Sequence, residues 1–261
     1  MDFLREGILP QLTQHAHLLR LQTELPDASF VVERFTGREA VNELFRFELH
    51  CLADNALVDP GALLGREATL RLLQADESLR NWHGYVTEAM SLGSDGGLAR
   101  YRLVIEPGLA FCAIRHDCFQ FQDKDALGVA EEILADYPTI AWRSEVTQRL
   151  RVHSRITQYR ESDLAFLVRV LSHEGLSFRF EHDQAALAGD DSVHARHTLV
   201  IFDREADAPT SLQPVVRFHR NDAPEHDDAV SMLREIREPQ PNRVSLSSWD
   251  YRKLTATAAT I

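Results

Sequence analysis

The sequence predicts an α+β fold that is mainly β, and three observations support this. Short apolar–polar alternations recur along the first 110 residues, at a spacing typical of a β-barrel or a β-sandwich. Two later segments, 126–137 and 163–174, carry apolar residues at helical spacing. Further short strand-like segments follow these helices. A chain of 261 residues is expected to form one or two domains.

The clearest strand of the first part contains Phe45, Phe47, Leu49 and Cys51, which alternate with polar residues. Residues 38–44 then form a short connection to the strand before it, and 91–97 (SLGSDGG) has the composition of a hairpin connection. The other strands expected here are 29–37, 68–73, 82–86 and 101–105. We place the first domain at 18–110, after a leader of residues 1–17.

The first helix is expected over 126–137, where Pro138 ends it. Its apolar face comprises Leu127, Ala130, Ile133, Leu134 and Tyr137.

The second helix is predicted with both of its ends. Ser162 is a good N-cap, and Asp163 places a negative charge in the first turn. Gly175 can adopt the left-handed conformation that ends a helix. Leu176, Phe178 and Phe180 then alternate with polar residues, as in a strand with one buried face. The expected apolar face comprises Leu164, Leu167, Val168 and Leu171.

From residue 185 the chain is richer in turns and acidic residues. Residues 185–196 are expected to form a polar loop and 198–202 a strand, and further strands are expected at 215–218, 230–236 and 243–251. Between Glu181 and Val230 there are eleven acidic residues and four Arg, a balance of −7.

The overall composition excludes several classes of partner and anchor. The formal net charge of −12 disfavours binding to nucleic acid or anionic lipid. No apolar run is long enough to span a bilayer, so no stable membrane anchoring is expected. The first residues lack the pattern of a signal peptide, so export by the general secretory route is not expected. The three cysteines suggest no disulfide framework; Cys51 is expected in the core, and Cys112 and Cys118 as reduced, partly buried thiols.

No motif indicates an enzyme, a cofactor site or a metal site. His194 and His197 form an H-x-x-H pair with His182 upstream, but no further ligand motif accompanies them, and histidines of a flexible loop explain them better than zinc. There is no nucleophile elbow and no phosphate-binding loop. Glu161 and Glu174 lie at opposite ends of one helix, too far apart to act jointly as acid and base.

The block from 157 to 182 closely resembles the VgrG family, the spike proteins of type VI secretion that are related to the hubs of contractile phage tails. His173 departs from the acidic residue expected before Glu174. The segment FTGREAVNELFRFELHC and the Trp249-Asp250-Tyr251 segment also resemble that family. The signature residues are Gln158, Tyr159, Glu161, Ser162, Asp163, Phe166, Leu167, Arg169, Glu174 and Gly175.

The resemblance implies a β-barrel hub domain (18–110), an α/β middle domain (111–205) and the beginning of a second β-barrel (206–261). The chain would then be a fragment or a naturally short member, without the β-helical spike.

The implied function is structural: a homotrimeric hub that caps a tube of hexameric Hcp-type protein and is propelled into a target cell by contraction. Effector or adaptor proteins are further possible partners. The chain would be cytoplasmic when assembled and then secreted. The alternatives are the hub of a phage tail or of another contractile device, and a carrier of an effector enzyme located outside this chain. For Tyr159 and Arg169 two roles stay open. Tyr159 packs at the helix entry and Arg169 pairs with a carboxylate, or both contact another subunit.

Overall fold

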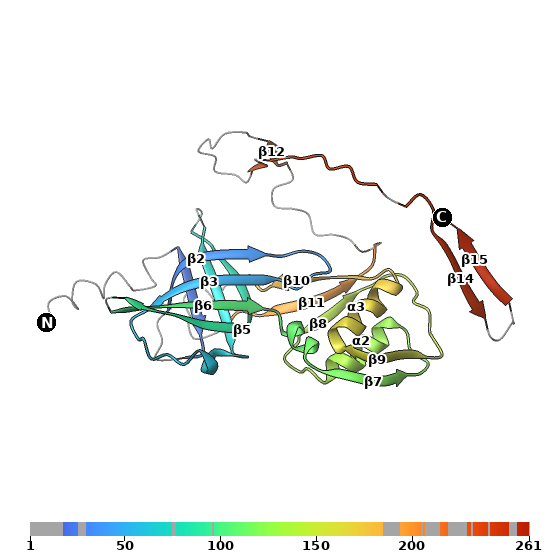
Figure 1. Cartoon of the computed structure of the whole chain (residues 1–261), viewed down its shortest axis with the longest axis horizontal. Coiled ribbons are helices and arrows are strands. Elements are labelled where there is room, and N and C mark those ends of the chain that lie inside the picture. The colour runs from blue at the N-terminus through green and yellow to red at the C-terminus, as the bar shows by residue number, and fades with distance from the viewer. Residues whose placement is uncertain are drawn as a thin grey trace. The chain divides into compact units, whose positions relative to one another are not determined.

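Six antiparallel strands in the first part of the chain form one curved sheet (Figure 1). Their order in the sheet is β1-β4-β5-β6-β3-β2. The strands are β1 (Leu19–Thr23), β2 (Phe30–Arg38), β3 (Arg46–Ala53), β4 (Glu67–Leu73), β5 (Leu79–Asp95) and β6 (Leu98–Glu106), with the short 3-10 helix η3 (Pro60–Leu63) between β3 and β4. The computed structural model describes residues 18–25, 30–74, 77–95, 97–184, 194–204, 206, 215–218, 229–230, 232–239, 241–250 and 255–260.

The sheet curls around one hydrophobic core. Alternate side chains of β3, Phe47, Leu49, Cys51 and Ala53, are almost fully buried and pack with residues from all six strands. The edge strands β1 and β2 are in contact. No ladder joins them among the described residues, so the sheet is a curled half-barrel. The predicted mainly β fold is therefore confirmed.

Gly84 shows how tightly β5 and β6 pack. A Cβ atom at this position would lie 2.6 Å from the Glu106 carbonyl oxygen and 2.6 Å from Ile105 Cγ2. The Glu106 carbonyl belongs to the backbone of a paired strand and cannot move aside as the end of a flexible side chain can. Only glycine therefore fits at position 84.

The hairpin connection predicted over 91–97 is wrong for most of its length. β5 continues to Asp95, and β6 begins at Leu98. The pairing of the two strands shifts register between Ser91 and Gly93, where Gly93 has a φ of +101°. The Gly and Ser residues therefore mark a β-bulge within a long strand as well as a turn.

The next part of the chain is an α/β assembly with its own core. A three-stranded sheet has the order β10-β11-β8, in which β11 runs antiparallel to β10 and parallel to β8. Helices α2 and α3 and a two-stranded ribbon, β7 paired with β9, pack with it. The elements are η4 (Gly108–Ala113), β7 (His116–Phe121), α2 (Ala126–Ala135), β8 (Trp142–Glu145), β9 (Ile156–Ser162), α3 (Asp163–His173), β10 (Ser177–His182) and β11 (His197–Phe202).

Both predicted helices are present, with two corrections. Helix α2 ends at Ala135 rather than 137, and the Asp125 side chain caps its start by accepting a hydrogen bond from Gly128 N. In α3 the fully buried apolar side chains are Phe166, Leu167, Val170 and Leu171, while Leu164 and Val168 are only half-buried. The predicted apolar face is therefore displaced around the helix from the buried one. Two neighbouring rows of apolar residues fit helical spacing, and the sequence does not tell which of them is buried.

The half-barrel and the α/β assembly belong to one compact unit, Met1–Asp207. Phe180 packs against both hydrophobic cores. The boundaries at 110 and 205 stay predictions. None of the described helices has the length and apolar character needed to cross a lipid bilayer.

The second compact unit, Ala208–Ile261, contains two small sheets. β12 (Arg217–Phe218) pairs with β13 (Ala229–Val230), and β14 (Ser245–Asp250) pairs with β15 (Thr255–Thr260). The strand predicted over 230–236 is wrong, since 232–236 has no regular structure. A second barrel stays a prediction. The leader 1–17, most of the loop 185–196 and residues 251–253 lie outside the described residues.

Candidate functional site

The signature residues lie on β9, on α3 and in the turn that follows α3, before β10 begins at Ser177. The Ser162 side chain accepts a hydrogen bond from Ala165 N at 3.2 Å and so caps α3, as predicted. Gly175 has a φ of +69°, and Leu176 N donates to Leu171 O at 2.9 Å across it. These bonds form a glycine-dependent helix end that sets the direction of Glu174 and β10.

Asp163 is fully buried and has its charge well compensated. Its Oδ2 accepts hydrogen bonds from Tyr137 Oη at 2.7 Å and pairs with Arg115 Nε at 2.7 Å. Its Oδ1 accepts a bond from Gln158 Nε2 at 2.8 Å. Burial and the hydrogen bond to Asp163 raise the pKa of Tyr137 above its usual value. A buried carboxylate with three partners links β9 and the segments that follow α2 and η4 to the start of α3, so its role is structural.

Glu161 and Arg169 form a two-point ion pair on the surface of the ribbon and helix. Arg169 Nε donates to Glu161 Oε2 at 3.1 Å, and its Nη2 donates to Oε1 at 2.5 Å. The guanidinium also donates to Thr157 O at 3.0 Å. The hydrogen bonds from Arg169 lower the pKa of Glu161 despite partial burial. This is the carboxylate contact that was expected for Arg169 within one subunit.

Tyr159 does not pack at the helix entry, and that expectation is wrong. Its side chain is 65% exposed. Arg160 follows it with a φ of +52° and forms the extra residue of a β-bulge between β7 and β9. The bulge turns Tyr159 outward, and the Arg160 guanidinium lies 5.3 Å from its ring centre.

Phe166 and Leu167 belong to the core of the α/β assembly. Phe166 is fully buried and stacks on Phe121, with ring centres 5.4 Å apart. Leu167 is 1% exposed. Most of the signature residues therefore position the helix rather than face solvent.

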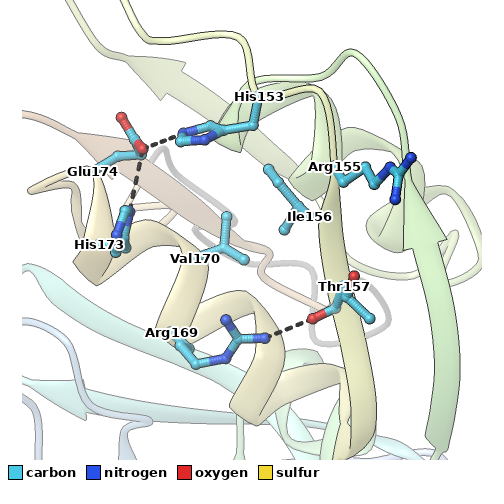
Figure 2. A pocket seen from close by; sticks show the side chains of 8 residues that line it. All are labelled: His153, Arg155, Ile156, Thr157, Arg169, Val170, His173 and Glu174. Atoms are coloured by element: carbon cyan, nitrogen blue, oxygen red, sulfur yellow. Dashed lines mark hydrogen bonds and ion pairs between the residues drawn. The ribbon is translucent and has the colours of Figure 1, made fainter. Parts of the chain in front are cut away.

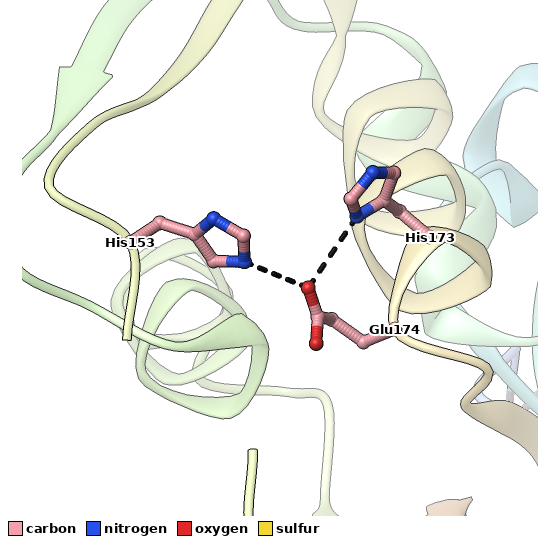
Figure 3. A group of neighbouring side chains, drawn as sticks. All are labelled: His153, His173 and Glu174. Carbon is pink, nitrogen blue, oxygen red and sulfur yellow. Dashed lines mark hydrogen bonds and ion pairs between the residues drawn. The ribbon is translucent and has the colours of Figure 1, made fainter. Parts of the chain in front are cut away.

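Glu174 lies at the edge of a surface pocket of about 220 Å³ (Figure 2). Its Oε1 lies 2.7 Å from His153 Nε2 and 3.4 Å from His173 Nδ1 (Figure 3). Burial acts to raise the pKa of Glu174, but its hydrogen bonds to the two histidines outweigh this, and the net pKa is lowered. Sequence analysis missed His153, because it is 21 residues from Glu174 and belongs to no motif.

Four histidines gather where the half-barrel meets the α/β assembly. His83 Nδ1 and His197 Nδ1 lie 2.8 Å apart, and His182 Nδ1 accepts a bond from His83 N at 3.1 Å. His194 Nδ1 lies 3.1 Å from Thr69 Oγ1. The expectation of flexible-loop histidines is therefore wrong for His182 and His197, which lie on the paired strands β10 and β11.

His83 and His197 are buried as neutral rings. Burial lowers the pKa of each to about 3, and repulsion from neighbouring basic side chains, mostly other histidines, would add to the cost of protonating either ring. Such a pair is a structural contact that protonation would disrupt.

Comparison with known proteins places this geometry in a family. Residues 38–260 match the Phage tail baseplate hub (GPD) family. The chain is 26% identical over 251 residues to the type VI secretion system spike protein VgrG1c of Pseudomonas aeruginosa, covering 95% of this chain and 33% of that protein. VgrG5 of the same organism is 30% identical over 189 residues, covering 71% of this chain and 22% of that protein. The chain thus spans about a third or less of the length of these relatives.

Solved structures show the same fold. The E. coli c3393 protein, described as a component of the type VI secretion system, superposes with a TM-score of 0.62 at 23% identity, covering 70% of this chain and 49% of that chain. A tail protein from Neisseria meningitidis superposes with a TM-score of 0.52 at 15% identity, covering 79% of this chain and 57% of that chain. With the family match over 38–260, the VgrG-like signature and the curled β-sheet, the chain belongs to the phage tail baseplate hub (GPD) family.

Proposed function

We propose that this chain is the hub part of a VgrG-type spike, a structural component of a contractile secretion machine. The family match over 38–260 is the observation that carries the proposal. Three copies would form a ring that caps a tube of hexameric Hcp-type protein. The machine would assemble in the cytoplasm, and contraction would deliver the spike into a target cell. Effector or adaptor proteins would bind elsewhere on the assembled spike.

The proposed role is mechanical, without catalysis. The carboxylates of the signature support this, because each is already engaged within the fold. Glu161 pairs with Arg169, Asp163 with Arg115 and Tyr137, and Glu174 with His153. A general acid or base must reach a substrate proton, and a carboxylate committed to a structural ion pair is poorly placed to do so.

Exposed side chains on the β7–β9 ribbon support a subunit contact. Tyr159 is 65% exposed and Phe119, on the neighbouring strand, is 47% exposed. Aromatic and Arg side chains are enriched in protein interfaces. Replacing Tyr159 with Ser should therefore weaken trimer formation.

Sedimentation of the 261-residue chain over a range of protein concentrations tests the proposal. A monomer–trimer equilibrium, and binding to Hcp-type tube protein from the same genome, are the expected results. A second candidate, the hub of a phage tail, predicts binding to a phage tail-tube protein instead. A chain that stays monomeric at high concentration and binds neither tube protein would contradict a hub role.

A further inference from the structure

We propose that His153, His173 and Glu174 form a binding site for one divalent transition-metal ion, with Zn²⁺ the best match. The three side chains each offer one ligand atom, and these atoms lie within 4.8 Å of one another (Figure 3). Two imidazole nitrogens and one carboxylate oxygen are a ligand set that Zn²⁺ uses in proteins. This site goes beyond the hub function proposed above.

The two distances to the Glu174 oxygen are close to those around a tetrahedral ion, and the two imidazole nitrogens lie within 4.8 Å of each other. Ligand atoms about 2.1 Å from a tetrahedral Zn²⁺ lie roughly 3.4 Å from each other. His173 Nδ1 is already 3.4 Å from Glu174 Oε1. His153 Nε2 is 2.7 Å from the same oxygen, so a rotation of either side chain that opens this hydrogen bond by about 0.7 Å would admit the ion.

The backbone around the ligands is firmly held. His153 N donates to Lys124 O at 2.9 Å, which ties its loop to the residues before α2. Glu174 is the C-cap residue of α3, and its N–H is bonded to the last carbonyls of that helix. Two of the three ligands therefore approach from elements that are fixed before an ion binds, which lowers the entropy lost on binding.

The local charges favour a cation. The site lies at the C-terminal end of α3, where the helix dipole places partial negative charge. Arg169 also lines the pocket, but Glu161 and the Thr157 carbonyl neutralise and hold its guanidinium. Figure 2 shows the Arg155 side chain directed away from the Glu174 carboxylate. The Glu174 carboxylate can therefore balance an ion once its hydrogen bond to His153 opens.

The type of ion follows from the ligands and the space. Ca²⁺ and Mg²⁺ prefer more oxygen ligands than this site has, whereas imidazole suits Zn²⁺, Ni²⁺ and Cu²⁺. The pocket of about 220 Å³ beside the ligands leaves room for a water molecule at a fourth position. The bound ion would fasten the loop containing His153 to the end of α3.

This proposal departs from the sequence-based expectation of no metal. That expectation considered His182, His194 and His197. In the structure the Nε2 of His197 accepts a bond from Gly108 N, and His182 contacts Glu39 and the His83 backbone. The three residues that offer a site instead are a loop histidine, His153, and two residues at the end of α3, His173 and Glu174.

Calorimetric titration of the chelator-treated 261-residue chain with Zn²⁺ tests the site. We expect one ion per chain. We also expect at least about tenfold weaker binding in each of the variants His153→Ala, His173→Ala and Glu174→Gln. His173 decides the test, because its side chain is 74% exposed and its loss should leave the fold intact, as circular dichroism would show. Titration with Co²⁺ should in addition give the visible absorption of a tetrahedral site, and His173→Ala should remove it.

His116→Ala is the matched control, because His116 is also exposed and belongs to the same assembly but lies on β7, outside the cluster. It should bind Zn²⁺ as the unchanged chain does. The absence of saturable binding would overturn the proposal and leave His153 and Glu174 as a simple hydrogen-bonded pair. If all three ligand variants bound Zn²⁺ as strongly as the unchanged chain does, the proposal would also be overturned, since the ion would then be held by other histidines.

Discussion

Asn42 and Phe178 are joined by two hydrogen bonds, although 136 residues separate them. Asn42 N donates to Phe178 O at 2.9 Å, and Phe178 N donates to Asn42 Oδ1 at 2.9 Å. β10 is an edge strand of its sheet, so Asn42 covers hydrogen-bonding groups that would otherwise face outward. A turn of the half-barrel is thereby attached to the α/β assembly.

Replacing Asn42 with Ala should lower the free energy of unfolding by about 1–3 kcal/mol. The variant loses the side-chain hydrogen bonds to Phe178 N and Ser177 Oγ. Each bond of this kind typically contributes about 0.5–1.5 kcal/mol to stability. Asn42 also has a φ of +63°, a conformation that Ala adopts at a cost of about 1 kcal/mol or more. Urea denaturation measures the change. Asn42→Gly is the control, since it removes the side chain but accepts the left-handed backbone, and it should therefore be less destabilising than Ala.

Replacing Leu167 with Asp should unfold the α/β assembly. Leu167 is 1% exposed within the core of α2, α3 and the β10–β11 sheet. An unpaired buried charge costs several kcal/mol, comparable with the roughly 5–15 kcal/mol that stabilises a whole domain. Circular dichroism should show loss of helix signal at 25 °C.

Ala165→Asp is the matched change on the exposed face of the same helix. It adds the same charge within the first turn of α3, where a negative group is favourable. Its melting temperature should stay close to that of the unchanged chain. An equal loss from both variants would mean that added charge, and not burial, causes the unfolding.

Only one of the three cysteines should react quickly with a thiol reagent. Cys51 and Cys112 are buried, and burial raises the pKa of each thiol to about 12. Cys118 on β7 is exposed. Because the thiolate is the reactive form, the native chain should show one fast thiol, and Cys118→Ser should remove it. Denaturant should expose the other two, and fast labelling of Cys112 in the native chain would contradict the buried position of η4.

The sequence predicted α3 and its surroundings well because the signals there are local. Ser162 and Gly175 mark the two ends of the helix, and the strand after it alternates clearly. β7 was missed because five of its six residues are exposed, so it lacks the apolar alternation of a half-buried strand. Its pairing with β9 is a tertiary contact that no window of sequence reveals.

The candidate sites were predictable only where one segment supplies the residues. The signature residues were found because they lie within 18 positions of each other, along β9, α3 and the turn after α3. The His153–Glu174 contact and the His83–His197 contact join residues 21 and 114 positions apart, respectively. Single histidines carry no sign of such partners. The exposure of Tyr159 depends on a β-bulge at Arg160, which also appears only in the paired strands.

The buried His83–His197 pair should make the fold lose stability as the pH falls from about 6.5. Both pKa values are lowered to about 3 in the folded chain, from an ordinary value of 6.5. Above pH 6.5 both states keep the rings neutral. Between pH 6.5 and 3 the unfolded chain binds protons that the folded chain does not. Stability is therefore greatest above pH 6.5, and falls by up to about 1.4 kcal/mol per pH unit for each histidine below it.

Between pH 6.5 and 5 the loss of stability caused by the two histidines can be measured without a contribution from the carboxylates. The carboxyl groups whose pKa values are lowered, such as Glu161 and Glu145, lose their contribution only below about pH 4.5, their usual value. Urea denaturation at pH 7, 6 and 5 measures the slope. The double variant His83→Asn, His197→Asn should be less stable at pH 7 but should show a clearly smaller slope, whereas exposed His116→Ala should keep the original one. An unchanged slope in the double variant would show that these rings take up protons within the fold, and that the contact between the half-barrel and the α/β assembly tolerates charge.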